Sequence, residues 1–354
     1  MALSVPKLVP GWIYCIREED YLDGSIGRFV KLGLTKRTVP IRIREHQTGN
    51  PRKEVSEYDL YLEMMDYAET YLHHYFAQDR IGGEWFDMDN AKVLAEVAPL
   101  LQTLEAEMAV EKPNFIVWSN LKTTRSNGNV IGPTPAVSAL HQSYILAEEN
   151  HTIAEARHKI HDNNLRALVG TNDGIEGVLT LIENNKSDSF NKDDFTTLVT
   201  AAQLAQCDDT KTTFKGNLIV ESGRNLATLD PVLDAQLTAS AGRITVSPNL
   251  TNLTNAETPL IQSIKDEHMA YLGTLRQLKE AEWECYKLKA QIVVALGANQ
   301  EITGVVTWRR YDDTKTAFSA KKAKELFPTE YNNSLRPVQN TVSVKIHRGR
   351  KYNP

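Results

Sequence analysis

Two runs near the start of the chain constrain its fold most, because both are rich in residues that favour extended backbone. They are "GWIYCIRE" (11–18) and "RFVKLGLT" (28–35), and their β-branched and aromatic content is typical of strands. The polar stretch between them contains Asp23-Gly24, a pair that favours a hairpin turn. We therefore expect an antiparallel hairpin at the beginning of the fold.

Helical and extended patterns alternate after this hairpin. "VPIRIREHQTGNP" predicts a short helix that starts near Pro40 and ends at Gly49-Asn50-Pro51. "EYDLYLEMM" alternates like a strand, a helix is expected over 67–80 with Asp66 as its N-cap, and "IGGEWFDM" is expected to be extended. A further helix follows up to Lys112. The predicted class is α+β, with a short, mostly antiparallel sheet flanked by helices in a first domain, 1–112.

The rest of the chain divides by composition into a linker (113–135), a mixed α/β domain (136–250) and a C-terminal module (256–354). Within 260–296, apolar residues recur at spacings of three and four, which predicts one long helix. A helical hairpin, a dimer contact and a coiled coil all fit this seam. We find no internal repeat in the order of the predicted elements. The role of 136–250 is not indicated.

Charge and cysteine content exclude several classes of protein. The formal net charge is −5, which is unlike a general nucleic-acid coat, but 305–354 carries eleven Lys and Arg against four Asp and Glu, a local +7. The alternative is that this basic run is simply a charged face in contact with solvent. The 3 cysteines are far apart, so neither a disulfide framework nor a zinc site is expected. No apolar run suits a signal peptide or a membrane span, and we expect a cytoplasmic protein.

The segment "YAETYLHHYF" (67–76) places Glu69 and His73 four residues apart, on one helical face. Taken alone, it fits an ordinary amphipathic helix better than a metal site. The residues around it change this interpretation. Tyr14 ends "GWIY", Lys31 begins "KLG", and Arg42 lies on the first helix.

In order and spacing, residues 10–90 resemble the GIY-YIG endonuclease superfamily, in the phage and bacterial branch whose second motif begins with Lys. The features that carry the resemblance are "GWIY", "KLG", Arg42 with the following "HQTGNP", Glu69-x-x-x-His73, and "GGEWF". The sequence departs from the family pattern at the first glycine, because Gly11 lies one position earlier than the motif requires.

The resemblance implies a role for each matching residue. Tyr14 would position or activate the attacking water, with Lys31 favouring its phenolate and binding phosphate. Arg42 would clamp the phosphate oxygens in a bidentate fork. Glu69 would hold one Mg²⁺ or Mn²⁺ together with water. Further candidates are His46 and His73 for proton transfer or phosphate contact, and Arg44 for nucleic-acid binding. Each has a structural alternative: a packed strand Tyr, or a solvated Arg or Glu.

A second stretch, 270–350, is similar to the closing segment of YqaJ-like phage recombination exonucleases, without that family's catalytic carboxylates. We expect it to bind nucleic acid or to dimerise. The basic and aromatic residues expected to contact phosphates are Trp308, Arg309, Arg310, Lys321, Lys322 and Lys324. A solvated basic face is the alternative.

These features together predict a metal-dependent DNA endonuclease of phage or mobile-element DNA metabolism. The expected partner is double-stranded DNA, the expected cofactor is Mg²⁺ or Mn²⁺, and a homodimer is considered. The first alternative is a catalytically inactive DNA-binding or regulatory protein that retains the GIY-YIG fold. The second is a phage structural protein that assembles through the helix 260–296.

Overall fold

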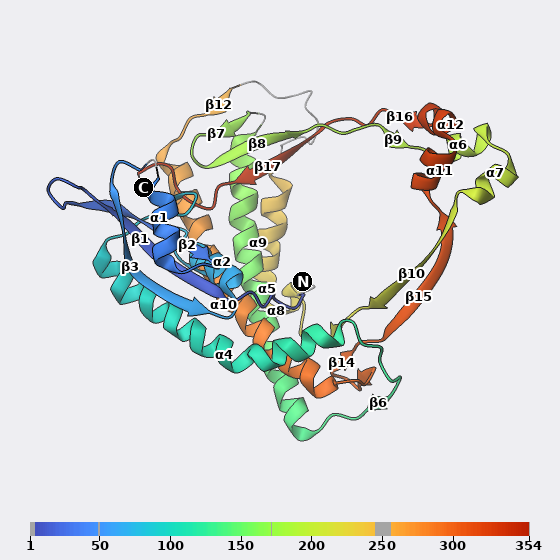
Figure 1. The fold of residues 1–354 in the computed structure, drawn as a ribbon, viewed down its shortest axis with the longest axis horizontal. Coiled ribbons are helices and arrows are strands. Elements are labelled where there is room, and N and C mark those ends of the chain that lie inside the picture. The colour runs from blue at the N-terminus through green and yellow to red at the C-terminus, as the bar shows by residue number, and fades with distance from the viewer. Residues whose placement is uncertain (1–3, 49, 171, 245–255, 354) are drawn as a thin grey trace.

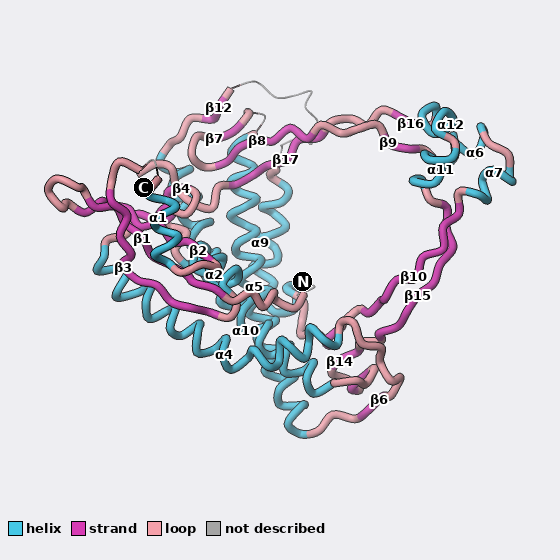
Figure 2. The backbone as a smooth tube through the Cα atoms, in the orientation of Figure 1, coloured by secondary structure: helices cyan, strands magenta, loops and turns pink. Residues whose placement is uncertain are grey.

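The computed structural model of the protein describes residues 4–48, 50–170, 172–244 and 256–353. It has the expected α+β class, with small antiparallel sheets and long helices (Figure 1). A helical body carries the N-terminal sheet on one side, and two ribbons hold a small helical unit on the other side (Figures 1 and 2). Within the described residues, no helix is both long enough and apolar enough to cross a membrane.

The N-terminal sheet is antiparallel, with strand order β3-β1-β2-β5-β4. The predicted hairpin is present, and Tyr14 of β1 lies directly opposite Gly33 of β2. The predicted strand around "EYDLYLEMM" is β3, and "IGGEWFDM" supplies β4 and β5. The strand bounds are β1 Gly11–Glu19, β2 Ile26–Thr35, β3 Lys53–Leu62, β4 Arg80–Gly82 and β5 Trp85–Asp87.

Helices cover both faces of this sheet. On one face, α1 (Val39–Gln47) packs on Tyr14 and Ile16. On the other, α2 (Met65–Tyr75) covers the alternate strand residues. The helix α2 is shorter than the predicted 67–80, and Met64 is its N-cap instead of Asp66, which lies in the first turn. There the Asp66 carboxylate favours the helix by opposing its dipole.

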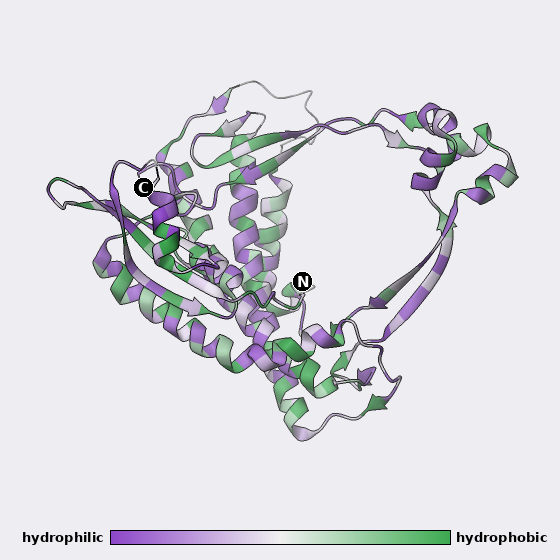
Figure 3. Cartoon of the chain, viewed as in Figure 1, coloured by the Kyte–Doolittle hydropathy of each residue, from purple (hydrophilic) through white to green (hydrophobic). Residues whose placement is uncertain are grey.

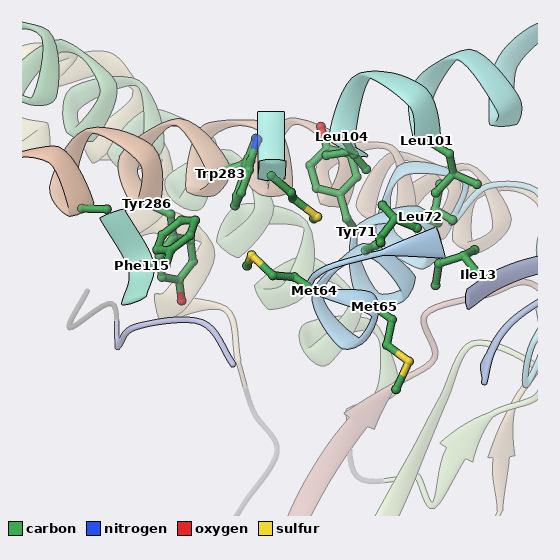
Figure 4. Close-up of a cluster of buried hydrophobic side chains, with 14 of the residues drawn as sticks. Ile13, Met64, Met65, Tyr71, Leu72, Leu101, Leu104, Phe115, Trp283 and Tyr286 are labelled. Carbon is green, nitrogen blue, oxygen red and sulfur yellow. The ribbon is translucent and has the colours of Figure 1, made fainter. Parts of the chain in front are cut away.

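The core beneath α2 continues without a break into the helical body. Figure 4 shows the α2 side chains Tyr71 and Leu72 beside Leu101 and Leu104 of α4 (Ala98–Leu121), with Trp283 of the body nearby. The helix α4 follows α3 (Asn90–Lys92) and a π-helical turn (Val93–Val97). It runs straight through the domain boundary predicted at Lys112, because Phe115 and Trp118, beyond that boundary, are buried in the same core. The predicted linker therefore begins only after α4.

Two helices of 35 residues each form the body: α5 (Pro135–Val169) and α10 (Gln262–Leu296). They pack antiparallel, as the hydrogen bonds from His158 to Thr274 and from the later Asn164 to the earlier Glu267 indicate. The predicted helix 260–296 is thus α10, and its apolar seam is covered by α5 of the same chain. Of the alternatives left open by the sequence, the intramolecular helix pair is the one observed.

The body is an internal duplication, which corrects the expectation of no repeat. Both long helices end at a glycine with positive φ, Gly170 (58°) and Gly297 (57°), and a second such pair follows at Gly177 (70°) and Gly304 (69°). The segments "GTNDGIEGVLTL" (170–181) and "GANQEITGVVTW" (297–308) have six of twelve residues in common. Equivalent residues are 126 to 128 positions apart along the two copies, roughly 129–221 and 256–348.

The two copies contain matching elements. The first copy comprises β6 (Val130–Ile131), α5, β7 (Gly174–Ile175), β8 (Leu179–Asn184), β9 (Ser189–Phe190), α6 (Lys192–Leu198), α7 (Ala201–Gln206), β10 (Asp208–Gly216) and β11 (Ile219–Val220). The second comprises β12 (Glu257–Thr258), α10, β13 (Glu301–Ile302), β14 (Val306–Thr307), β15 (Arg310–Phe318), α11 (Ala320–Leu326), α12 (Pro328–Asn333), β16 (Leu335–Arg336) and β17 (Thr341–Ile346). Between them lie α8 (Leu226–Leu229) and α9 (Pro231–Gly242). The sequence also favours a strand at "AGRITVSP" (241–248), but Ala241 and Gly242 form the end of α9, and 245–248 lie outside the described residues.

The copies exchange strands. One sheet has the order β12-β7-β8-β17 and the other β11-β14-β13-β6, so each hairpin of one copy is flanked by strands of the other copy. Matching hydrogen bonds cross between the copies: the His347 amide donates to the Val178 carbonyl, and the Glu221 amide donates to the Val305 carbonyl, both at 2.8 Å. The predicted separation into 136–250 and 256–354 is therefore not a division into independent domains. The two segments form one intertwined pseudo-dimer.

The helical unit at the far end, which we call the tip unit, consists of α6, α7, α11 and α12. Its small core is separate from that of the body and centres on Phe195, Cys207 and Ala323. Two ribbons carry it: β10 with β15, and β8 with β17 continued by β9 with β16 (Figure 1). Hydrophilic residues predominate along β10 and β15, whereas apolar residues concentrate in the body (Figure 3).

Candidate active site

Five polar side chains from four elements approach one another on the α1 side of the N-terminal sheet, and Glu69 of α2 lies close enough to Tyr14 to act on it electrostatically. Because side chains alternate along a strand, Tyr14 of β1 and Lys31 of β2 share the face that α1 covers. The residues of this cluster are Tyr14, Lys31, Arg42 and His46 of α1, Glu69 of α2, and Glu84 of the turn between β4 and β5.

Tyr14 is buried, with 1% of its surface exposed. Its ring lies across Gly33, where a Cβ atom would come within 2.6 Å of the phenol oxygen. The Arg42 guanidinium next to the hydroxyl acts to lower the pKa of Tyr14, but burial has the larger effect and raises it. Tyr14 is therefore a neutral hydroxyl at pH 7 and not the phenolate that the resemblance implies.

Lys31 links α1 to the β4–β5 turn. Its Nζ atom lies 2.6 Å from Nδ1 of His46 and 3.5 Å from Oε2 of Glu84. Burial lowers the pKa of His46, and the neighbouring Lys31 and Arg42 cations lower it further. His46 is therefore neutral at pH 7, and its Nδ1 accepts a hydrogen bond from the Lys31 ammonium.

Glu69 is half-buried, and no hydrogen bond or ion pair is formed by it within the described part of the chain. Burial raises the pKa of Glu69 to about 7, and the negative charge of Glu84 acts in the same direction, against the Arg80 cation. Glu69 also raises the pKa of Tyr14, so the two side chains lie in one electrostatic environment. A half-buried carboxylate with raised proton affinity, beside a second carboxylate such as Glu84, is typical of a place that binds a cation.

The chemistry of these ligands suits a hard divalent ion. Among the residues that the structure describes, no group of three or more His, Cys, Asp or Glu is placed to chelate a metal. Glu69, with Glu84 nearby, would hold an ion that keeps several of its water ligands, which is the habit of Mg²⁺. The site thus fits Mg²⁺ better than zinc, which requires a closed nitrogen and sulfur set.

His73 and Arg44, two of the predicted site residues, form no hydrogen bond or ion pair with the cluster residues in the described part of the chain. His73 is buried, with its Nε2 atom 2.9 Å from the Leu32 carbonyl oxygen and its ring against Phe86. Burial lowers the pKa of His73 to about 4. The neutral ring therefore anchors α2 to β2, with Arg80 and Glu84 close enough to act on its charge. Arg44 is exposed on α1.

The C-terminal residues predicted to contact phosphates are likewise separate from the cluster. Trp308 and Arg310 are buried, and Arg310 donates to the carbonyl oxygens of Gly297 (2.9 Å) and Asn299 (3.1 Å). These bonds satisfy backbone acceptors at the end of α10, so both residues belong to the core. Arg309 is exposed, and Lys321, Lys322 and Lys324 lie on α11 in the tip unit, where Lys322 pairs with Asp209.

Two residues of the site were missed by sequence reasoning. Glu84 is the acidic residue within "GGEWF", a motif that was noted without assigning its carboxylate a role. Arg80 begins β4, four residues earlier, and its charge acts on both Glu69 and Glu84. A single carboxylate inside an otherwise apolar and glycine-rich turn is the signal that points to Glu84.

Comparisons of the chain with protein-family models, with curated proteins and with solved structures return no match.

Proposed function

We propose that the protein is a metal-dependent DNA endonuclease that hydrolyses one phosphodiester bond at a time. The observation that carries the proposal is that Tyr14, Lys31 and Arg42 share one face of the sheet, with Glu69 of α2 close enough to raise the pKa of Tyr14. These residue types supply what the hydrolysis needs: a held water, cations for the phosphate oxygens, and a carboxylate for a divalent ion.

Each side chain of the cluster has a distinct role in this proposal. Arg42 and Lys31 bind the non-bridging oxygens of the scissile phosphate and offset the charge that develops on them. The neutral Tyr14 hydroxyl, fixed against Gly33, orients the attacking water by hydrogen bonding. His46, which is neutral, can receive the water's proton through Lys31: the Lys31 ammonium passes a proton to Nδ1 of His46 and takes one from the water.

Glu69 is the proposed metal carboxylate. A Mg²⁺ or Mn²⁺ ion bound there would supply Lewis-acid stabilisation of the leaving oxygen. Binding of the ion requires the ionised carboxylate, and the ion in turn favours that form.

A bacterial cytoplasm, as the host compartment of a phage or mobile element, remains our proposed location. A homodimer would need a surface other than the α10 seam, because α5 covers it.

The alternative is a DNA-binding protein of this fold without turnover. Nicking of a supercoiled plasmid in Mg²⁺ or Mn²⁺ separates the two, with wild type compared to Glu69→Gln. The matched control is Glu105→Gln, which removes an exposed carboxylate of α4. We expect nicking by wild type and the control, and a loss of at least about 100-fold in Glu69→Gln.

Two results would contradict the proposal. Nicking that survives in Glu69→Gln or in excess chelator would show that the site lies elsewhere. Plasmid binding by well-folded wild type without any nicking, in both metals, would favour the inactive binding protein.

A further inference from the structure

A second concave surface lies where the N-terminal sheet meets the duplicated body. This junction pocket has a volume of about 730 Å³ and is bordered by β4, α5, α10, β17 and the segment after β17. It joins residues that are distant in the sequence, because β4 belongs to the domain of the candidate active site and the other elements belong to the two repeat copies. The side chains used below are Arg80, Arg166, Lys345, Arg348 and Lys351.

The lining of the junction pocket is strongly basic. Five Lys and Arg side chains line it, together with His158 and His347, against a single carboxylate, Asp162. Asp162 is already paired with Arg166 at 2.8 Å and with Lys159. Within the described residues, Lys345, Arg348 and Lys351 form no ion pair with any carboxylate. The pocket therefore carries uncompensated positive charge.

Arg348 is the clearest case of this excess. Its neighbours are His74, whose Nε2 lies 3.0 Å from Nη1 of Arg348, and the cation of Arg80. Burial and the adjacent cations, Arg348 first among them, lower the pKa of His74 to about 3. The neighbours of the guanidinium in these contacts are therefore neutral or positive, and the exposed group can bind an anion from outside the protein.

The internal duplication supplies a direct comparison. In the second copy Ile346 of β17 pairs with Leu179, and in the first copy Val220 of β11 pairs with Val306 in the same way. Ile346 is therefore equivalent to Val220, and the residues after β17 are equivalent to those after β11. The positions equivalent to Arg166, Lys345, Arg348 and Lys351 are occupied by Val293, Ile219, Ser222 and Asn225. The repeated fold therefore forms without these four positive charges, which both copies contribute at the end of the body that adjoins the candidate active-site domain.

The segment after β17 is held tightly against β4. The Arg350 amide donates to the Arg80 carbonyl oxygen at 2.6 Å, and Arg350 Nη2 lies 3.0 Å from Oδ2 of Asp87. A Cβ at Gly349 would lie 2.8 Å from that same carbonyl oxygen, so a glycine is needed for this approach. The contact places Arg348 next to Arg80, and Arg80 in turn lies close enough to Glu69 to act on its charge.

We propose that the junction pocket binds backbone phosphates of a nucleic acid that extends from the candidate active site onto the duplicated body. This inference rests on the proposed function, since it names where that substrate would be held beyond the cleavage site. Arg and Lys without carboxylate partners are the usual phosphate contacts, and they bind sequence-independently. Arg80 would contact the strand at the boundary between the two sites.

The test is binding of a fluorescent duplex DNA of about 30 base pairs to the full-length protein, in Ca²⁺ without Mg²⁺, at several salt concentrations. Lys345→Gln/Arg348→Gln removes two pocket charges at exposed positions. The control, Lys122→Gln/Lys186→Gln, removes two exposed charges that do not line the pocket. We expect about 10-fold weaker binding and a salt slope smaller by about 2 for the pocket variant alone. Thermal unfolding of both variants checks that they are folded.

Three outcomes overturn the inference. If the pocket and control variants bind DNA with equal affinity and equal salt slope, the pocket is not a DNA-binding site. In that case plasmid nicking by wild type would show that the proposed endonuclease function still holds. Absence of DNA binding by wild type would exclude a nucleic-acid ligand at the pocket. Inorganic phosphate that stabilises wild type but not the pocket variant, while DNA has no effect, would identify a site for free anions instead.

Discussion

Tyr14 and Gly33 face each other across the β1–β2 pair, and the phenol ring of Tyr14 lies over the Cα of Gly33. A Cβ at position 33 would be 2.6 Å from the phenol oxygen and 2.7 Å from the ring carbon that bears it. The glycine of "KLG" is thus a packing requirement for the tyrosine of "GWIY", and it explains why the two motifs occur on neighbouring strands.

Gly33→Ala is expected to displace Tyr14 from its position beside Arg42. Overpacking of this kind costs about 1–3 kcal/mol of unfolding free energy, and misplacement of a catalytic group lowers the rate of nicking by at least about 10-fold. Urea unfolding and plasmid nicking measure the two effects. Gly132→Ala is the control, because no atom lies within 4 Å of its Cβ position. Equal nicking by both variants would show that the position of Tyr14 is not important.

The raised pKa of Glu69 predicts a pH dependence of stability. A carboxyl whose pKa rises from 4.5 to about 7 on folding binds its proton more tightly in the native protein. Its stabilising contribution is therefore complete below about pH 4.5 and is lost as the pH rises through 7. Between pH 5 and 8, metal-free wild type should lose about 1–3 kcal/mol more than Glu69→Gln, after allowance for solvent screening.

Urea unfolding of both proteins at several pH values, in chelator, measures this difference. Mg²⁺ should restore stability to wild type at pH 8 and have little effect on Glu69→Gln, because the ion binds the ionised carboxylate. Parallel pH curves for the two proteins would show that Glu69 titrates normally, and would remove one argument for metal binding there.

Arg309 and Arg310 are adjacent but are expected to behave differently on substitution. Arg310 is 1% exposed and stabilises the end of α10 through the carbonyls of Gly297 and Asn299. Arg310→Ala should lower the unfolding free energy by about 2–4 kcal/mol, since it leaves a cavity and unsatisfied acceptors. Arg309→Ala should change it by less than about 0.5 kcal/mol. Chemical denaturation of the two variants decides this, and similar values for both would contradict the buried position of Arg310.

The strand exchange can be tested in the β10–β15 ribbon. Thr212 and Thr314 are directly paired, with their hydroxyl oxygens 2.8 Å apart. Thr212→Cys/Thr314→Cys should form a disulfide on mild oxidation. Thr213→Cys/Thr314→Cys should not, because consecutive residues of a strand face opposite sides. Counting free thiols by mass spectrometry distinguishes the two variants. The three native cysteines are buried and free, and they give a constant background in both. A disulfide in the second variant alone would mean that the register is shifted by one.

Much of the N-terminal sheet and its site could be predicted from the sequence. Asp23-Gly24 marked the β1–β2 hairpin, and Pro40 and Gly49-Asn50-Pro51 marked the ends of α1, because turn and helix signals are local. The approach of Tyr14, Arg42 and Glu69 followed from the order of the motifs. The burial of His73 could not be predicted in this way, because His73 shares a helical face with Glu69. Only its packing against β2 and Phe86 distinguishes His73 from Glu69.

The duplication and the strand exchange of the body were not predicted from the sequence. The two copies share identity around the glycine turns at Gly170 and Gly297, where positive φ restricts the residue type, and at one His-x-x-Tyr on each long helix, beginning at His141 and His268. Along the helices, each copy meets different neighbours, and the side chains differ accordingly. The periodicity of α10 identified an apolar face but not the helix that covers it.

The sequence alone therefore determined the class of the fold, the local strands and helices, and the residue types of the candidate site, because these depend on neighbours along the chain. Only the tertiary structure decided that Arg310 is a core residue, that Arg348 and Arg80 meet at a basic pocket, and that the two copies exchange strands. Strand pairing and charge burial depend on contacts between segments more than a hundred residues apart, and no local pattern encodes which distant segment will supply the partner.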